Sequence, residues 1–135
     1  MARYGIYGVI KKYNIGDSVE LLGGLQHDKV RYALCRGHIF LNTSLTESFC
    51  LSMLEAASCG LLVVSTDVGG IPEVLPPGLA YMAKPEAGAL CEQLFRAIQD
   101  YDKISCSDMH QIVKDTYSWR QVAERTERVY NFSMQ

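Results

Sequence analysis

The sequence lacks the features that would assign this 135-residue chain to a membrane or to nucleic acid. No apolar run approaches the ~20 residues that a membrane-spanning helix needs, and the N-terminus lacks the apolar segment of a signal peptide. The formal net charge is only −2, so no general affinity for nucleic acid or acidic lipid is expected. We therefore expect no transmembrane segment and no nucleic-acid partner. Any membrane anchor would come from another part of the protein or from a partner.

Cysteine and histidine are present, but not in patterns that bind a metal ion or build a disulfide framework. There are five cysteines, an odd number: Cys35, Cys50, Cys59, Cys91 and Cys106. No two are spaced as Cys-x-x-Cys, and the three histidines have no metal-ligand spacing. We therefore expect reduced thiols in a cytosolic setting, buried as small hydrophobic side chains, and no metal site.

What the sequence does contain is an alternation of short apolar runs with amphipathic segments. The predicted strands are 19–22, 38–41, 61–65 and 79–83. The predicted helices are 3–13, 27–35, 48–59, 86–99, 107–116 and 118–131, the last opened by a capping box at 118–121. This alternation implies parallel strands joined by right-handed crossovers, with helices covering both faces. The predicted fold class is therefore α/β, a Rossmann-like parallel sheet with helices on both faces, in a single domain over residues 1–135.

Three finer expectations follow from this reading. Four strands are fewer than the five or six of a usual doubly wound domain, and the chain opens on a helix, so we expect the first strands to be missing and the domain to be incomplete. Five side chains of helix 86–99 follow the helical period: Leu90, Cys91, Leu94, Ala97 and Ile98. Trp119, in the first turn of the last helix, is expected to be a packing anchor.

Two glutamates, Glu47 and Glu55, lie eight residues apart where a loop leads into helix 48–59. Eight helical residues rise ~12 Å and end on another face, so we expect Glu47 in the loop and Glu55 two turns into the helix. This separation is too wide for a glycosidase acid/base pair and favours two acids that hold opposite parts of a long ligand through its hydroxyls. The free amides between them can receive a diphosphate. Taken alone, the pair is better explained as solvated helix charges, but the small residues 56–60 indicate that Glu55 packs closely.

This stretch resembles the retaining nucleotide-sugar glycosyltransferases, a family that shares a Glu-x7-Glu motif and the two-domain GT-B fold. The resemblance extends from Val19 to Arg120 and is most specific in four segments, 37–47, 49–50, 55–60 and 69–76. These segments are most similar to the subgroup of phosphatidylinositol N-acetylglucosaminyltransferases, which perform the first step of glycosylphosphatidylinositol-anchor synthesis. The resemblance implies that the chain is the C-terminal, donor-binding portion of such an enzyme. It further implies a place on the cytosolic face of the endoplasmic reticulum, other transferase subunits as partners, UDP-GlcNAc as donor substrate, and no cofactor.

The resemblance also implies a role for each matching position. Glu47, the catalytic residue of the motif, would contact hydroxyls of the donor sugar, and Glu55 would hold the ribose hydroxyls of UDP. The backbone amides that would receive the diphosphate belong to Ser48, Phe49, Cys50 and Leu51. Gly23, Gly24 and Leu25 would lie near the uracil, whereas Gly69 and Gly70 would shape the loop beside the site, because glycine permits positive φ and close backbone approach.

The sequence departs from the family in three ways. Ser48 and Cys50 occupy positions where the family often has glycine, and Asp67 stands where the subgroup tends to carry arginine. The N-terminal domain that would bind phosphatidylinositol, and the Arg/Lys pair that binds the diphosphate, have no counterpart in these 135 residues. Two alternatives therefore stay open. The chain could be a non-catalytic truncated isoform that acts as a binding or assembly module, or it could belong to a related retaining glycosyltransferase with another sugar or acceptor.

Overall fold

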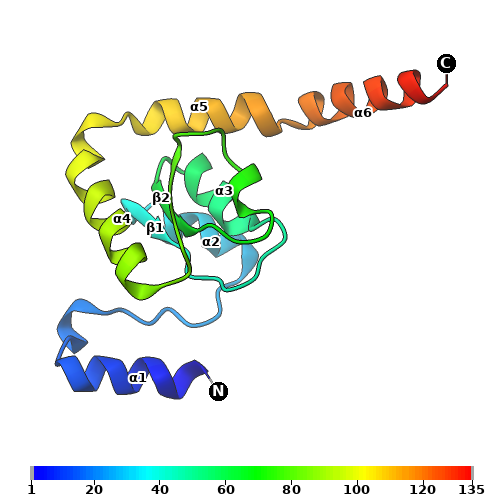
Figure 1. The fold of residues 1–135 in the computed structure, drawn as a ribbon. Coiled ribbons are helices and arrows are strands. Elements are labelled where there is room, and N and C mark those ends of the chain that lie inside the picture. The colour runs from blue at the N-terminus through cyan, green and yellow to red at the C-terminus, as the bar shows by residue number, and fades with distance from the viewer. Residues whose placement is uncertain (1, 135) are drawn as a thin grey trace.

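The computed structural model describes residues 2–134, apart from the side chains of residues 2–4 and 106. At its centre is a parallel sheet of three strands, which lie in the order β1 (Ile39–Leu41), β2 (Leu62–Thr66) and β3 (Ala80–Ala83) (Figure 1). The middle strand, β2, pairs in parallel with a neighbour on each side. The predicted α/β class with parallel strands is confirmed.

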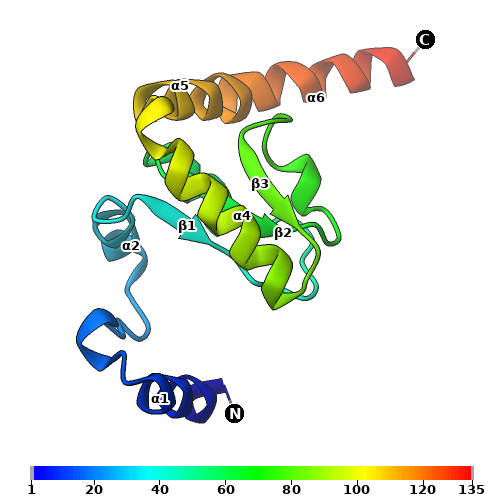
Figure 2. The same ribbon diagram turned by 60° about the vertical axis from the view of Figure 1, so that its left-hand side comes forward.

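Helices connect and cover the strands. The α-helices are α1 (Ala2–Tyr13), α2 (His27–Leu34), α3 (Leu51–Ser58), α4 (Ala87–Asp100), α5 (Cys106–Tyr117) and α6 (Trp119–Ser133). Three short 3₁₀ turns are η1 (Gly16–Ser18), η2 (Ile71–Glu73) and η3 (Tyr101–Lys103). Helix α4 crosses one face of the sheet (Figure 2), while α3 packs on β2 from the other face and α5 packs on α3. Helices on both faces of the sheet were predicted, and this is confirmed.

The core has two halves because successive side chains of a strand point to opposite faces of the sheet. Val63 of β2 points toward α3 and α5, where it joins Met53 and Met109. Leu62 and Val64 point toward α4 and pack near Ala97. All five residues of β2 are buried, which explains why its apolar residues 62–64 are consecutive and do not alternate with polar ones.

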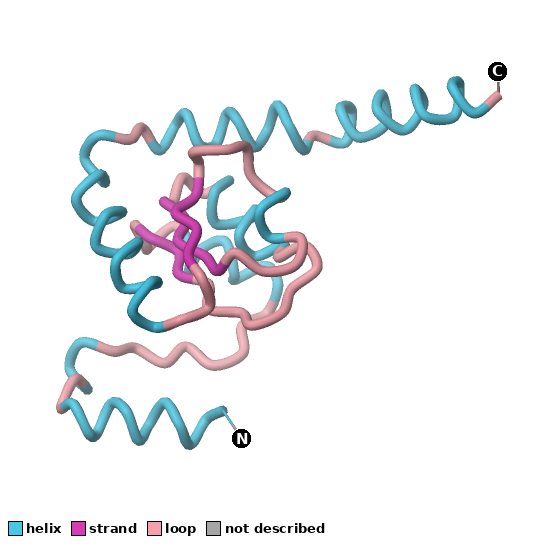
Figure 3. Tube along the Cα trace, viewed as in Figure 1, coloured by secondary structure: helices cyan, strands magenta, loops and turns pink. Residues whose placement is uncertain are grey.

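The two terminal helices extend away from this core. Figure 3 shows α1 at one end of the molecule and α6 at the other, each projecting beyond the body that surrounds the sheet. The chain exposes 10124 Å² of surface, whereas a compact protein of 15.1 kDa exposes about 7,000 Å². The excess surface includes apolar side chains on both helices, such as Ile6 (50% exposed) on α1 and Phe132 (81% exposed) on α6.

One predicted strand is wrong. Segment 19–22 is not a strand, so the sheet has three strands among the described residues and not four. Val19 has extended backbone angles (φ −127°, ψ 119°), as its sequence favours, but Leu21 and Leu22 are each 45% exposed. An extended segment becomes a strand only where a neighbouring strand accepts its backbone hydrogen bonds, and this segment has no such neighbour.

The predicted start of helix 48–59 is also wrong. Helix α3 begins at Leu51, because Cys50 before it has a left-handed backbone (φ 57°, ψ 66°) that an α-helix cannot contain. Glu55 is therefore the fifth residue of α3, just over one turn into the helix and not two. The predicted end is confirmed, since Gly60 follows with φ 85°, the conformation that glycine commonly supplies after a helix.

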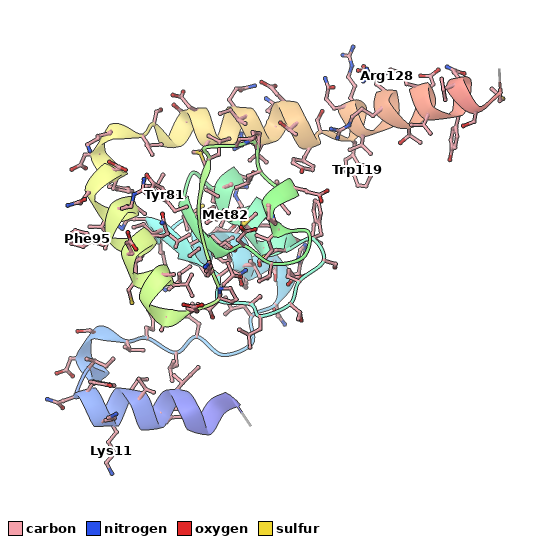
Figure 4. The ribbon with its side chains drawn as sticks, in the orientation of Figure 1. Lys11, Tyr81, Met82, Phe95, Trp119 and Arg128 are labelled. Carbon is pink, nitrogen blue, oxygen red and sulfur yellow. The ribbon has the colours of Figure 1, made fainter. Side chains whose placement is uncertain are left out.

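Several side chains expected inside are exposed. On α4, Leu90, Leu94 and Ala97 pack toward the sheet, but Cys91 is exposed and Ile98 is 57% exposed. Among the other cysteines, Cys50 is buried, Cys59 is half-buried and Cys35 is exposed. These three and Cys91 are free thiols, and the side chain of Cys106 lies outside the described side chains. Trp119 is not a packing anchor, because 89% of it is exposed at the start of α6 (Figure 4). Ser118 does cap α6, accepting a hydrogen bond from the amide of Gln121 at 3.3 Å.

Candidate functional site

The candidate site lies where β1 and β2 end. In a parallel sheet the carboxyl ends of neighbouring strands meet at one edge, and ligands bind in the crevice outside that edge. The loop 42–50 leaves β1 there and leads into α3, while the turn 67–70 leaves β2 and leads into η2. The sequence pattern predicts Glu47 in the first of these connections and Gly69 and Gly70 in the second, and the structure brings the two connections into contact.

Glu47 lies in the loop, as predicted, and its side chain is half-buried. Its carboxylate oxygen Oε1 accepts a hydrogen bond from the backbone amide of Ser48 at 3.0 Å. A pocket of 500 Å³ opens beside it, lined by Leu45, Thr46, Glu47, Ser48, Val68 and Gly69. A volume of this size lies within the range of small-molecule sites. Glu47, Ser48 and Gly69, three of the predicted site residues, are thus brought together.

Gly69 and Gly70 hold this loop at a distance that only glycine permits. The amide of Gly70 donates a hydrogen bond to the carbonyl oxygen of Glu47 at 3.1 Å. A Cβ atom on Gly69 would collide with that same carbonyl oxygen, and a Cβ on Gly70 would collide with the carbonyl oxygen of Ser48. Gly69 also has a positive φ of 54°. The expectation that these glycines allow close backbone approach is confirmed.

Helix α3 begins directly after loop 42–50, and its N-terminus is the next part of the candidate site. Cys50 is buried and has a left-handed backbone, a conformation that glycine adopts without strain and that other residues rarely adopt. The first amides of a helix have no acceptor within the helix, which applies here to Leu51 and Ser52. Leu51 is 65% exposed, so the start of α3 lies at the surface, where the partial positive charge of a helix N-terminus attracts anions.

Phe49, also in the loop before α3, contacts helix α5. Its ring meets that of Tyr117 edge to face, with 6.1 Å between ring centroids, and the Tyr117 hydroxyl donates to the carbonyl oxygen of Val74 at 2.6 Å. Tyr117 is the last residue of α5, so this contact fixes the loop before α3 against α5. Loop 42–50 is therefore held by three parts of the fold. Strand β2, turn 67–70 and helix α5 each contact it.

Glu55 lines a second pocket, of 760 Å³, between α2, α3 and α5. Its side chain is half-buried, so it is not a fully solvated helix charge. The pocket residues are His27, Val30, Arg31, Leu34, Cys35, Leu54, Glu55, Ser58, Cys59, Gly60, His110, Val113, Lys114, Tyr117 and Ser118. The two glutamates of the motif thus line separate pockets, one in the loop before α3 and the other beside its second turn.

Sequence reasoning missed the basic residues of the second pocket. Arg31 on α2 and Lys114 on α5 both line it with Glu55, although they are 24 residues before and 59 residues after that glutamate. No motif or period links such distant positions, so only the packing of α2 and α5 about α3 reveals them. In the same pocket, burial and a hydrogen bond with Cys35 raise the pKa of the Cys59 thiol.

The remaining predicted positions lie in the segment that leads into α2. Gly23 has a positive φ of 69°, and Leu25 is 42% exposed, with Gly24 between them. This segment does not line either of the two pockets described above. Within residues 2–134, with the described side chains, no group of three potential metal ligands gathers. None of the helices in that range combines the length and apolarity needed to cross a bilayer.

Comparison with known proteins identifies the family of the chain. Residues 3–127 match the family described as glycosyl transferases group 1. The chain is 54% identical over 126 residues to a subunit of the phosphatidylinositol N-acetylglucosaminyltransferase of Homo sapiens, a match that covers 91% of this chain and 26% of that protein. It is 50% identical over 121 residues to the subunit of the same name in Arabidopsis thaliana, covering 90% and 27%. The chain thus spans about a quarter of the length of the curated relatives it matches.

The fold is also found in a solved structure. Sucrose-phosphate synthase from Thermosynechococcus elongatus superposes with a TM-score of 0.80, over 99% of this chain and 35% of that one. The sequence identity is 24%, so this likeness concerns the fold alone.

Proposed function

Because the chain belongs to the group 1 glycosyl transferases, we propose that it binds the nucleotide-sugar donor of a retaining N-acetylglucosaminyltransferase. The donor is UDP-GlcNAc, and the complete enzyme transfers GlcNAc to phosphatidylinositol, the first step of glycosylphosphatidylinositol-anchor synthesis. The identity to the human and Arabidopsis proteins supports this choice of sugar and acceptor. We assign the phosphatidylinositol acceptor to a part of the enzyme outside the segment that this chain matches, and we include the other transferase subunits among its partners.

The observation that carries the proposal is the placement of Glu47 and Glu55 around the N-terminus of α3. Glu47 lies before the helix, in the loop pocket, and Glu55 lies just beyond its first turn, in the second pocket. Ionised carboxylates accept hydrogen bonds from hydroxyl groups, and a nucleotide-sugar has hydroxyls at both ends. We assign the sugar hydroxyls to Glu47 and the ribose hydroxyls to Glu55. The diphosphate, which separates the two ends of the donor, then falls at the helix N-terminus.

The amides of residues 48–51 receive the diphosphate in this proposal. The partial positive charge at a helix N-terminus favours such a group. The Ser48 amide is bonded to the Glu47 carboxylate in the structure, so donor binding frees this amide and turns the carboxylate toward the sugar. Arg31 and Lys114, which share the pocket of Glu55, supply positive charge near the nucleotide. Segment 23–25 lies near the uracil.

The chain contributes no membrane span of its own among the described helices. We place it on the cytosolic face of the endoplasmic reticulum, where the complete enzyme meets its lipid acceptor. A second candidate function is a binding or assembly module without catalysis. UDP binding without sugar transfer by the complete protein would support it.

Calorimetric titration of the 135-residue chain with UDP-GlcNAc, UDP and CMP tests the proposal. We expect saturable binding of the two uridine nucleotides and weaker binding of CMP, which lacks both the diphosphate and the uracil. The absence of saturable binding, or equal affinity for CMP, would contradict the proposal. Competition with UDP-glucose distinguishes GlcNAc from another sugar: a donor site for GlcNAc prefers UDP-GlcNAc to UDP-glucose.

A further inference from the structure

Strand β2 ends in two hydroxyl side chains that are completely buried. Ser65 and Thr66 have 0% exposure and follow three buried apolar residues. Burying a hydroxyl without a hydrogen-bond partner costs about 1–3 kcal/mol, so each needs a partner inside the fold. Both partners lie in the loop 42–50 that carries Glu47. The Thr66 hydroxyl donates to the carbonyl oxygen of Ser44 at 2.7 Å, and the Asn42 side-chain amide donates to the Ser65 hydroxyl at 3.0 Å.

Asn42 completes this connection from the other side. Its backbone amide donates to the carbonyl oxygen of Val64 at 2.9 Å, which extends the pairing of β1 and β2 by one residue. Its side-chain oxygen accepts hydrogen bonds from the Ser44 hydroxyl at 2.9 Å and from the Ser44 amide at 3.3 Å. An asparagine that bonds to a backbone amide two residues later makes a tight local turn. The position of Ser44 is therefore set by Asn42 and by Thr66 together.

Glu47 is three residues beyond Ser44, and its backbone is held by the same segment that ends β2. Gly70 donates to the carbonyl oxygen of Glu47, and Gly69 leaves no space between the two backbones. The loop is thus fixed at Ser44 by Thr66 and at Glu47 by Gly70. Because Thr66 and Gly70 are only four residues apart, one short segment determines where the backbone of Glu47 lies, and with it the region that the carboxylate can reach.

We propose that Thr66 is a positioning residue for the donor site, acting through Ser44 to hold Glu47 at the sugar end of the ligand. The inference rests on the proposed function, since it concerns how Glu47 meets the donor. Thr66 is completely buried and acts through the loop, without contact to the ligand. Loss of its hydroxyl frees the Ser44 carbonyl and loosens the loop, which disturbs the sugar contact more than the contacts of UDP with Glu55.

The test compares Thr66→Val, which keeps the shape and removes the hydroxyl, with Thr66→Ser, which keeps the hydroxyl. Thr116→Val is the matched control, because the half-buried Thr116 on α5 also donates its hydroxyl to a carbonyl oxygen, that of Ile112 at 2.8 Å. For each variant of the 135-residue chain, calorimetry gives the affinities for UDP-GlcNAc and for UDP, and their ratio reports the sugar contact. A variant that merely destabilised the fold would not change this ratio.

We expect Thr66→Val to lower the ratio of UDP-GlcNAc affinity to UDP affinity about fivefold or more, in line with the loss of one hydrogen bond. Thr66→Ser and Thr116→Val should keep the wild-type ratio. If Thr66→Val does not fold, Ser65→Ala removes the bond that the Asn42 side chain donates to the end of β2, and it should lower the ratio in the same direction. An unchanged ratio in the folded variant, or an equal fall for both ligands, overturns the positioning role. Failure of the wild-type chain to bind UDP overturns the donor-site proposal itself.

Discussion

The α-carbon of Gly69 lies against the carbonyl oxygen of Glu47, and no side chain fits between them. The contact joins the glycine turn after β2 to the glutamate that begins the Glu-x7-Glu motif, although 22 residues separate them in the sequence. Two features of the sequence that look independent are therefore one structural unit. A change at the glycine acts on the position of the glutamate.

Gly69→Ala should destabilise the fold more than Gly78→Ala. Both glycines have positive φ, which costs about 1–2 kcal/mol for a residue with a side chain. A Cβ on Gly78 meets nothing within 4 Å, whereas a Cβ on Gly69 collides with Glu47 and adds about 1–3 kcal/mol for overpacking. Urea unfolding of the two variants measures the difference. Equal losses would mean that the loop moves aside without cost.

Glu55→Ala should weaken UDP binding tenfold to a hundredfold. A hydrogen bond to a charged group contributes about 1.5–3 kcal/mol, which converts to that range of affinity. Calorimetry with UDP provides the measurement, and circular dichroism checks that the variant is folded. Glu92→Ala, an exposed glutamate on α4 on the other face of the sheet, serves as the control and should bind UDP as wild type does. UDP affinity unchanged by Glu55→Ala would remove Glu55 from the site.

Glu47→Gln should impair use of the donor sugar more than UDP binding. The carboxylate would accept hydrogen bonds from sugar hydroxyls, and UDP itself has no sugar for it to contact. In the complete enzyme we expect turnover to fall while UDP affinity, measured by inhibition, changes little. Equal losses of UDP affinity in the Glu47 and Glu55 variants would show that the two roles are not divided in this way.

These 135 residues alone should transfer no sugar. They correspond to about a quarter of the length of their relatives, and a reaction between two bound molecules needs both held in place. Loss of one preorganised group that stabilises the leaving diphosphate already costs about 10²–10³ in rate. Incubation with labelled UDP-GlcNAc and phosphatidylinositol vesicles, followed by lipid extraction, measures transfer. Labelled lipid above the level given by a Glu47/Glu55 double variant would show that the chain is self-sufficient.

Asp100 should make stability depend on pH in the acid range. Its carboxylate accepts hydrogen bonds from Lys103 at 2.7 Å and from the Tyr81 hydroxyl at 3.1 Å, and the Lys103 bond above all holds its pKa below the usual 3.8. Because the pKa of Asp100 is lower in the folded chain than in the unfolded chain, its ionised carboxylate stabilises the folded state at pH values above the unfolded pKa. This stabilisation is lost as the pH falls through the folded pKa. Asp100→Asn should therefore lower the urea midpoint at neutral pH.

The difference between Asp100→Asn and wild type should shrink below about pH 3, where the carboxyl is protonated in the unfolded chain and increasingly so in the folded one. The control is Asp102→Asn, a change at an exposed aspartate two residues later in η3. A midpoint difference that stays constant between neutral and acid pH would attribute the effect of Asp100→Asn to packing and not to charge.

The sequence pattern predicts the parts of the fold that local chemistry determines. The buried run of β2, the amphipathic stripe of α4, the stop at Gly60 and the cap at Ser118 each follow from a few neighbouring residues. The motif spacing likewise places Glu47 in a loop and Glu55 on a helix. These features need no knowledge of the rest of the chain.

The parts that the sequence could not predict depend on distant partners. Segment 19–22 has the composition of a strand but no neighbour to pair with, and Trp119 has the character of an anchor but no surface to pack on. The left-handed backbone of Cys50 shifts the start of α3, because the loop before it is held by contacts from β2, turn 67–70 and α5. Arg31 and Lys114 share the pocket of Glu55 only through the packing of three helices.

The exposed terminal helices also determine how the chain responds to heat. An isolated helix of about 12–15 residues is marginal in water, and α1 has 12 residues with Ile6 and Val9 each half exposed. Warming should therefore melt α1 and the outer turns of α6 gradually, before the sheet and its covering helices unfold in one cooperative step. The loss of helical circular dichroism would begin below the temperature at which the core absorbs most of its heat, and a single melting temperature would not describe the whole chain.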